Sequence, residues 1–178
     1  MKTKKTVFVD CNDTLIAVRH ANRGEEAPAG FKAIERDGQY FHVMARPSAA
    51  PFLSALAEDD CEIVVLTGGS TRIQGLLLNL ARLGRLVTDI IGYDLRGAVE
   101  VPENWVLVDD LQNGSISFEE KLSMLGITRK TVGEAKYVQV VKQHCIQCVA
   151  FKGGEDSDPL SGLLETVREK LGHKYESK

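Results

Sequence analysis

The stretch KKTVFVDCNDTLI, residues 4–16, changes from apolar to polar at a single position. The apolar residues 7–9 are followed directly by Asp10, and Asn12 and Thr14 come shortly after it. A short, continuous apolar run of this kind is typical of a strand buried on both faces of a parallel sheet. The stretch therefore predicts a first strand that ends in a loop of polar side chains, which makes the loop a candidate functional site.

Length and composition indicate one soluble domain. The chain has 178 residues, of which 43% are hydrophobic; this is enough for one core, so we expect a single domain over residues 1–178. The formal net charge of −3 provides no basic surface for nucleic acid. No apolar run approaches the roughly 20 residues of a membrane span, and residues 7–9 are too short for a signal peptide. We therefore expect a cytoplasmic protein that binds neither nucleic acid nor membrane. Its oligomeric state stays open.

Strand-like and helix-like segments alternate along the chain. Apolar runs that end in polar residues predict strands at residues 6–10, 62–68, 104–110 and 145–151. Helical patterns follow at residues 49–60, 71–84 and 158–172, the last with Asp158 as N-cap and Gly172 as terminator. This order predicts an α/β fold with a mainly parallel sheet and right-handed crossovers.

One segment interrupts the alternation. Residues 31–46 contain two alternating runs on either side of Asp37-Gly38, and an Asp-Gly pair between such runs is a strong hairpin signal. The preceding residues 19–30 are polar and contain Gly and Pro, so we expect a loop there. The sequence thus predicts a β-hairpin inserted between the first strand and the first helix.

Three of the predicted strands end in polar side chains, namely Asp10, Thr67 and the pair Asp109-Asp110. In an open α/β sheet the carboxyl ends of the strands face the ligand crevice, so these groups are expected to converge. Carboxylates that lie together need a cation between them, and a site of few carboxylates and a substrate phosphate suits Mg²⁺. The competing interpretation is that each residue is only a turn former or helix cap. Three polar strand ends in this order along the chain favour a shared site over three independent turns or caps.

These motifs resemble those of the haloacid dehalogenase (HAD) superfamily. VFVDCNDTL is similar to its first motif, VVLTGGS to its second and WVLVDD to its fourth. The hairpin that leads into ARPSAAPFLSALAEDD, and the ending AFKGGEDSDPLSGLLETVREKLG, resemble the NLI-interacting-factor-like branch, which includes small phosphatases of the RNA polymerase II tail. The resemblance implies a HAD-like, Rossmannoid three-layer sandwich with strand order 54123 and the hairpin as a small cap over the site.

The resemblance also implies roles for the motif residues. Asp10 is the expected nucleophile that forms an aspartyl-phosphate, and Thr14 fixes the register of its loop. Mg²⁺ is expected to bind the Asp10 carboxylate, the backbone carbonyl of Asn12 and the side chain of Asp110, with Asp109 behind them.

The phosphate is expected on the second motif, where the Thr67 hydroxyl and the amides near Gly68 and Gly69 would hold its oxygens.

Two departures from the family pattern concern charge. The family has a lysine between its second and fourth motifs, but no lysine lies between Thr67 and Asp109. Arg96 is the expected substitute, because a guanidinium binds phosphate in bidentate fashion. The arginines at positions 72, 82 and 85 fall in a helical pattern and are expected to face solvent.

The second departure is Asn12, which stands where the phosphatases carry the aspartate that protonates the leaving group. An amide cannot transfer that proton, and general acid-base catalysis is worth about 10²- to 10⁴-fold. The expected function is therefore a Mg²⁺-dependent phosphatase or phosphotransferase that is slowed by Asn12, with a phosphorylated small molecule or phosphoprotein as substrate. The alternative is a catalytically weak module that binds a phosphorylated ligand or partner. A third alternative is the receiver domain of a two-component system, which also combines a phosphoacceptor aspartate, an acidic pair and a threonine. Its motifs follow a different order along the chain, which disfavours this alternative.

The cysteines give a weaker signal. His144-Cys145 and Cys148 have the spacing of half a zinc site, but they lie in a strand-like background without a second pair nearby. Buried reduced thiols are the simpler interpretation.

Overall fold

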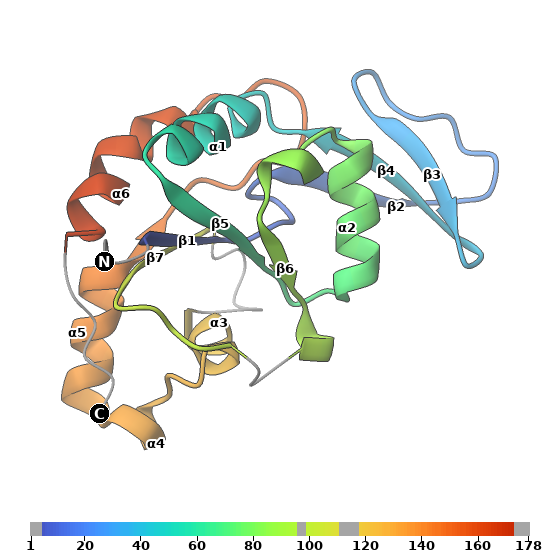
Figure 1. Ribbon diagram of the computed structural model, residues 1–178. Helices are drawn as coiled ribbons and strands as arrows, with labels where there is room; N and C mark the ends of the chain where they lie inside the picture. Colours follow the sequence, from blue (N-terminus) through green and yellow to red (C-terminus); the bar gives the residue numbers. More distant parts are fainter. Residues whose placement is uncertain (1–4, 96–98, 111–117, 173–178) are drawn as a thin grey trace.

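The computed structural model describes residues 5–95, 99–110 and 118–172 and is built around a five-stranded parallel sheet (Figure 1). Its strands lie in the order β6-β5-β1-β7-β8. Their bounds are β1 Lys5–Val9, β5 Cys61–Leu66, β6 Asp89–Ile91, β7 Asn104–Asp109 and β8 Cys145–Gln147. Numbered along the chain, this is the order 54123 with the first strand in the centre, so the prediction is confirmed.

Helices cover both faces of this sheet and make three layers (Figure 1). One face packs against α1 (Ala49–Glu58), α2 (Thr71–Leu80) and α6 (Leu164–Lys170), and alternate residues of β1 such as Val7 and Val9 point into this core. The other face packs against α3 (Phe118–Met124), α4 (Arg129–Val132) and α5 (Glu134–His144). Because both faces are buried, the strands read as unbroken apolar runs. The three-layer α/β prediction is confirmed.

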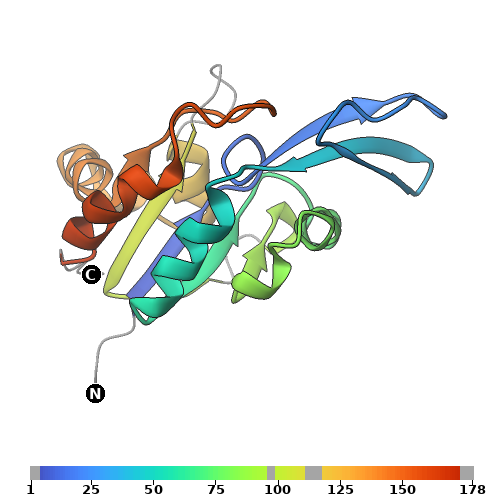
Figure 2. The ribbon, with the colours of Figure 1, turned by 90° about the horizontal axis from the view of Figure 1, so that it is seen from above.

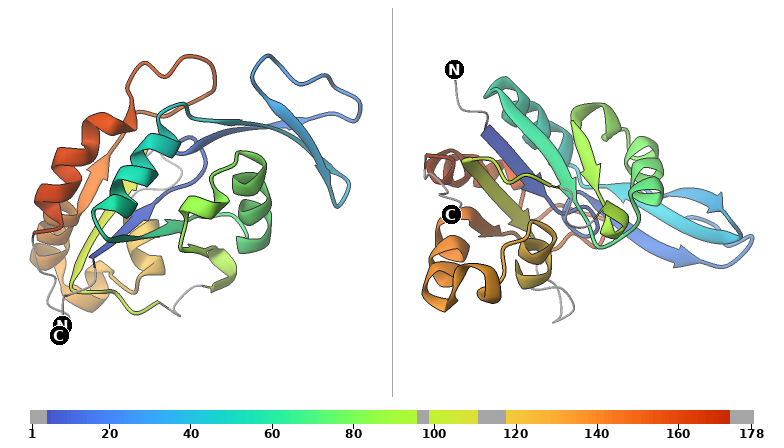
Figure 3. Two further views of the ribbon diagram at one scale, coloured as in Figure 1. Left: turned by 45° about the horizontal axis from the view of Figure 1, so that its top comes forward. Right: turned by 60° about the horizontal axis from the view of Figure 1, so that its bottom comes forward.

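The predicted hairpin is present as β3 (Lys32–Arg36) and β4 (Gln39–Ala45). Asp37 and Gly38 both have positive φ, at 52° and 74°, as a two-residue hairpin turn with the twist of the strands requires. A third strand, β2 (Ile16–Ala21), pairs with β4, so the expected loop at residues 19–30 was partly wrong. Arg19 and His20 of this edge strand are polar and exposed to solvent. Figures 2 and 3 show the antiparallel sheet extending beyond the carboxyl edge of the central sheet.

Two predicted element boundaries were also wrong. The last strand stops at Gln147 instead of residue 151. The C-terminal helical segment starts with a 3₁₀ turn, η4 (Leu160–Leu163), and the Leu160 N–H donates to Ser48 Oγ at 2.9 Å, so Asp158 is not its cap. Among the residues that the structure describes, two further 3₁₀ turns are η1 (Gly84–Leu86) and η2 (Tyr93–Leu95). In the described residues no helix has the length and apolarity to cross a membrane.

Candidate active site

Asp10 follows the central strand β1 and is 7% exposed. Its backbone N–H donates to the carbonyl of Val108 at 2.9 Å, which extends the parallel pairing of β1 with β7 by one residue. Val9 is in register with Val65 on β5 and with Val108 on β7. The ends of three adjacent strands are therefore level, and this register is what brings Asp10, Thr67 and the acidic pair after β7 to one place.

Three carboxylates gather there. Oxygens of Asp10, Asp109 and Asp110 lie within 4.8 Å of one another, and all three residues are buried. The Thr14 hydroxyl lies between two of them, 3.3 Å from Asp10 Oδ2 and 3.1 Å from Asp110 Oδ1. A hydroxyl has one proton, so Thr14 donates to one carboxylate at a time. The fixed position of Thr14 therefore sets the spacing of the two carboxylates.

A lysine that the sequence analysis missed supplies the positive charge. Lys121 on α3 is 2% exposed, and its Nζ donates to an Asp10 carboxylate oxygen and, at 2.8 Å, to the carbonyl of Leu66. The same Nζ is 3.9 Å from Asp109 Oδ2. Leu66 directly precedes Thr67, so one ammonium joins the end of β5 to the carboxylate at the end of β1. Arg96, the residue expected to provide this charge, lies outside the described residues.

Burial and nearby charges shift the pKa values of the clustered carboxylates. Burial raises the pKa of Asp10, and the Lys121 ammonium opposes part of this rise. Burial also raises the pKa of Asp110, with a further contribution from the neighbouring negative charge of Asp10. With all three acids ionised, one lysine leaves two negative charges unbalanced. The site therefore has the charge of a pocket for a divalent cation.

The second motif forms a tight loop before α2. The Thr67 N–H donates to the carbonyl of Ile91 at 2.9 Å, and the Gly69 N–H donates to Thr67 Oγ1 at 3.2 Å. Ser70 caps α2 by accepting from the Ile73 N–H at 3.3 Å. Backbone amides and a hydroxyl thus lie together at a helix N-terminus of the kind that holds phosphate groups. We call residues 67–70 the phosphate loop.

Asn12 and Asp13 differ sharply in their surroundings. Asn12 Oδ1 is buried and has no hydrogen-bond partner among the described residues. Asp13 has a positive φ of 63°, and its carboxylate is paired with the Lys152 ammonium. Asp13 is thus engaged outside the carboxylate cluster and does not stand in for the acid that Asn12 replaces.

The residues present fit Mg²⁺. Asn12 Oδ1 and Asp110 Oδ2 are both buried oxygens without a hydrogen-bond partner in the described part of the chain. Buried acceptors of this kind are rare unless an ion or water satisfies them. Asp110 belongs to the cluster with Asp10 and Asp109, and these three carboxylates form a set of hard oxygen donors, which is the chemistry that Mg²⁺ prefers.

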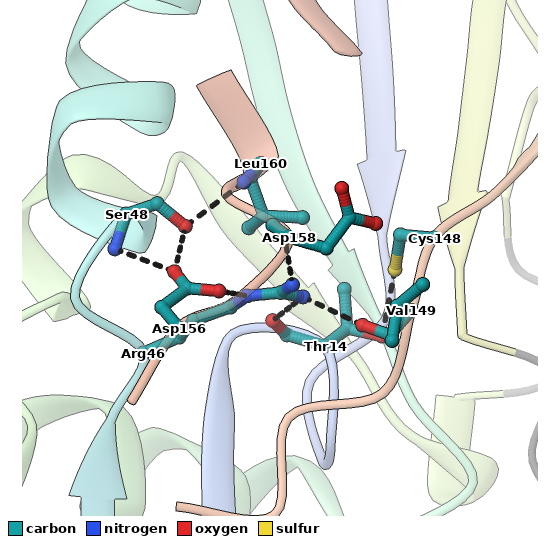
Figure 4. Close-up of polar contacts among 8 residues, drawn as sticks. All are labelled: Thr14, Arg46, Ser48, Cys148, Val149, Asp156, Asp158 and Leu160. Atoms are coloured by element: carbon teal, nitrogen blue, oxygen red, sulfur yellow. Dashed lines mark hydrogen bonds and ion pairs between the residues drawn. The ribbon is translucent and has the colours of Figure 1, made fainter. Parts of the chain in front are cut away.

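A buried arginine contacts the loop that follows β1 (Figure 4). Arg46, between β4 and α1, pairs through Nε with Asp156 Oδ1 at 2.9 Å, and the two side chains are 1% and 6% exposed. Its other nitrogens donate to the carbonyls of Val149 at 2.9 Å and Thr14 at 3.4 Å, and to that of Asp158. One guanidinium therefore connects the antiparallel sheet, the loop that follows β1 and the segment after β8.

The candidate zinc residues have other partners. His144 Nδ1 is 2.9 Å from the carbonyl of Trp105, and its ring stacks on the Trp105 ring. Cys145 and Cys148 are buried free thiols, and Cys148 Sγ donates weakly to Thr14 Oγ1 at 3.9 Å. Burial raises the pKa of Cys145 to about 12 and that of Cys148 to about 11, so both stay protonated at neutral pH.

Comparison with known proteins links this geometry to a family. The model of the NLI interacting factor-like phosphatase family matches residues 5–91, which include Asp10 and Thr67. Residues 5–91 resemble an NLI interacting factor-like phosphatase. The resemblance predicted from the sequence is confirmed over these residues, whereas its C-terminal part stays a prediction. The family match ends before Asp109 and Asp110, which the sequence motif predicted, and before Lys121, which the structure alone brings to the site. No curated protein sequence matches the chain.

Two solved structures share the fold of this chain at low sequence identity. Fission yeast RNA polymerase II CTD phosphatase Fcp1 bound to beryllium fluoride has a TM-score of 0.51 at 14% identity, and covers 95% of this chain and 50% of its own. A second structure of Fcp1 has a TM-score of 0.54 at 14% identity, over 95% and 48% of the two chains. A HAD-superfamily hydrolase from Ehrlichia chaffeensis has 8% identity and a TM-score of 0.48, over 96% and 99%. The chain thus spans about half the length of the Fcp1 structures.

Proposed function

We propose that the protein is a Mg²⁺-dependent phosphatase or phosphotransferase of the HAD type that acts through an aspartyl-phosphate on Asp10. The observation that carries the proposal is the group of three buried carboxylates with Lys121, level with the phosphate loop. The family match over residues 5–91 supports the phosphatase class. The bound beryllium fluoride of the Fcp1 structure belongs to that protein and suggests the same kind of ligand for this one.

The residues divide the reaction between them. Asp10 attacks phosphorus, its new oxygen–phosphorus bond replaces the bond to the leaving group, and water then displaces Asp10. Lys121 neutralises charge on the nucleophile, while the Thr67 hydroxyl and the amides near Gly69 hold the phosphoryl oxygens. Asp10, the backbone carbonyl of Asn12 and Asp110 would hold Mg²⁺, which would supply positive charge beside the phosphate. Catalysis in this scheme is mostly positioning and electrostatics.

Asn12 favours the second candidate function, a module that binds a phosphorylated ligand or partner without efficient turnover. An amide neither protonates a leaving group nor activates water. In the first reading, phosphorylation of Asp10 still proceeds from a reactive donor and hydrolysis is slow. In the second reading no adduct forms. The two readings therefore differ in one measurable species.

The experiment is intact-protein mass spectrometry after incubation with acetyl phosphate and Mg²⁺. The wild type should gain one phosphoryl group, located on Asp10 by peptide mapping, and Asp10→Asn should gain none. Asn12→Asp should shorten the lifetime of the adduct, because it restores a base for the attacking water. The expected change approaches the ~10²-fold lower bound for general acid-base catalysis. Asp13→Asn is the matched control, since the Asp13 carboxylate is paired with Lys152. The absence of an adduct would support the binding module.

We also propose that the ligand is a phosphorylated small molecule or a phosphoprotein, and that the protein is cytoplasmic.

A further inference from the structure

Two residues with exposed apolar side chains belong to a turn whose backbone contacts the phosphate loop. Tyr93 and Leu95 belong to the turn η2, which follows β6 in Figure 1, and they are 53% and 44% exposed. In the described part of the chain the other exposed large hydrophobic residues are Val138 and Val149. Single exposed apolar residues are common, so exposure alone carries no functional meaning. The position of η2 is what distinguishes this pair.

Hydrogen bonds fix η2 against the phosphate loop and the first residue of α2. The Tyr93 N–H donates to the carbonyl of Gly69 at 3.1 Å, and the Gly92 N–H donates to Thr71 Oγ1 at 3.1 Å. Asp94 Oδ1 accepts from the Thr71 N–H at 3.0 Å and from its hydroxyl at 2.8 Å. A Cβ at Gly92 would lie 2.5 Å from the Thr71 nitrogen and 2.6 Å from the Gly69 oxygen, so the contact requires glycine. The backbone of the turn that carries Tyr93 and Leu95 is therefore fixed against the phosphate loop.

An independent constraint on the substrate comes from Asn12. Its side chain has no acidic proton to give to a leaving group. The neighbouring Asp13 carboxylate is paired with Lys152, and the three clustered carboxylates are assigned above to the nucleophile and to the cation. The oxygen that leaves phosphorus thus departs without a proton from Asn12 or Asp13. Such a site favours esters whose leaving oxygen is stable as an anion.

We propose that the substrate is the phosphate ester of a phenol, with its ring held on the rim formed by Tyr93 and Leu95. This inference rests on the proposed function and names its substrate class. An aryl oxygen spreads its negative charge into the ring, and the phenol of tyrosine ionises at about pH 10, whereas an aliphatic alcohol is a far weaker acid. A planar apolar ring is also the group that gains most from contact with an aromatic and an aliphatic side chain.

The transfer step balances without a protein acid. The Asp10 oxygen forms a bond to phosphorus while the bond from phosphorus to the aryl oxygen breaks. The bonding electrons leave with the phenolate, which takes its proton from water. Water then attacks phosphorus, inorganic phosphate leaves, and the Asp10 carboxylate is regenerated.

The first test compares leaving groups. A series of aryl phosphates of increasing phenol pKa, with phosphoserine as the aliphatic ester, is assayed as the rate of Asp10 phosphorylation. In the wild type the rate should fall steeply along the series. In Asn12→Asp the rate should depend less on the pKa of the leaving group. The rate for phosphoserine should rise toward the ~10²-fold lower bound for an acid catalyst, and the rate for 4-nitrophenyl phosphate should rise far less. Free phosphotyrosine and a phosphotyrosine peptide distinguish a small-molecule source from a protein source.

The second test is binding and needs no turnover. Phenylphosphonate should bind more tightly than methylphosphonate by calorimetry, and Tyr93→Ala should remove about two- to ten-fold of that preference, the range expected for one aromatic contact. Val138 on α5 is about as exposed as Tyr93, and Val138→Ala should leave the preference for phenylphosphonate unchanged. Equal rates for aryl and aliphatic esters, or an unchanged preference in Tyr93→Ala, would overturn the substrate class while the phosphorylation of Asp10 stands. No adduct from any donor, acetyl phosphate included, would overturn the proposed function and this inference together.

Discussion

Replacing Arg46 with methionine leaves the carboxylate of Asp156 buried without its counter-charge. The side chains of this pair are 1% and 6% exposed, and Arg46 also donates to three backbone carbonyls. Removing one partner of a buried ion pair costs about 3–5 kcal/mol, because the remaining charge is left uncompensated. For a chain of this length each kcal/mol lowers the melting temperature by about 2–4 °C, so we expect Arg46→Met to lower it by roughly 6–20 °C.

The assay is urea unfolding followed by circular dichroism, with a double-mutant cycle. Asp156→Asn leaves an acceptor for Arg46 and Ser48, so it should cost less than Arg46→Met. The double variant should be less destabilised than the sum of the two single variants, with a coupling of about 0.5–3 kcal/mol. Arg168→Met breaks an exposed ion pair with Asp59 and should leave the midpoint nearly unchanged. A loss below about 1 kcal/mol in Arg46→Met, the level of a surface pair, would refute the reasoning.

Three further predictions concern the site and its support. Asp110→Ala should abolish the Mg²⁺ binding that calorimetry detects in the wild type, and equal binding in both would remove the metal site. Lys121→Met should slow phosphorylation of Asp10 by about 10²- to 10³-fold, the usual cost of one lost electrostatic donor, and an unchanged rate would make the lysine purely structural. Burial would raise the pKa of Asp156, but hydrogen bonds from Ser48 and Arg46 outweigh it and lower the pKa. Its stabilisation is therefore complete above about pH 4 and is lost as the pH falls below that value, and Asp156→Asn should flatten this acid limb of the unfolding midpoint.

The fold was largely predictable because its strands are short and buried on both faces. Residues 7–9 have no polar interruption, and an unbroken apolar run that ends in polar residues has few alternatives to a parallel strand. The turn at Asp37-Gly38 was predictable for a different reason, since its positive φ angles select these residue types. Strand β2 (Ile16–Ala21) was missed because its pairing with β4 is a long-range contact and its polar half has no apolar alternation.

The candidate site was only partly predictable. Asp10 and Asp110 end strands whose level is set by the register of the sheet, so sequence order alone places them together. Lys121 was missed because it follows the acidic pair instead of preceding it. A signal existed in the helical pattern, where Phe118, Lys121 and Leu122 share the face that packs on the sheet. A lysine in an apolar stripe is almost never buried without a partner, so it predicts an anion beneath the helix.

The site depends on both halves of the chain. The family match ends at residue 91, before β7 and α3, yet Asp10, the proposed nucleophile, lies inside it. Because β1 is paired in parallel with β7, the residue after Val108 has to lie beside Asp10, and this is where Asp109 and Asp110 stand. The first half alone would therefore present a nucleophile without its cation ligands or the ammonium of Lys121. The chemistry proposed for Asp10 therefore also requires residues after position 91, which the family model does not match.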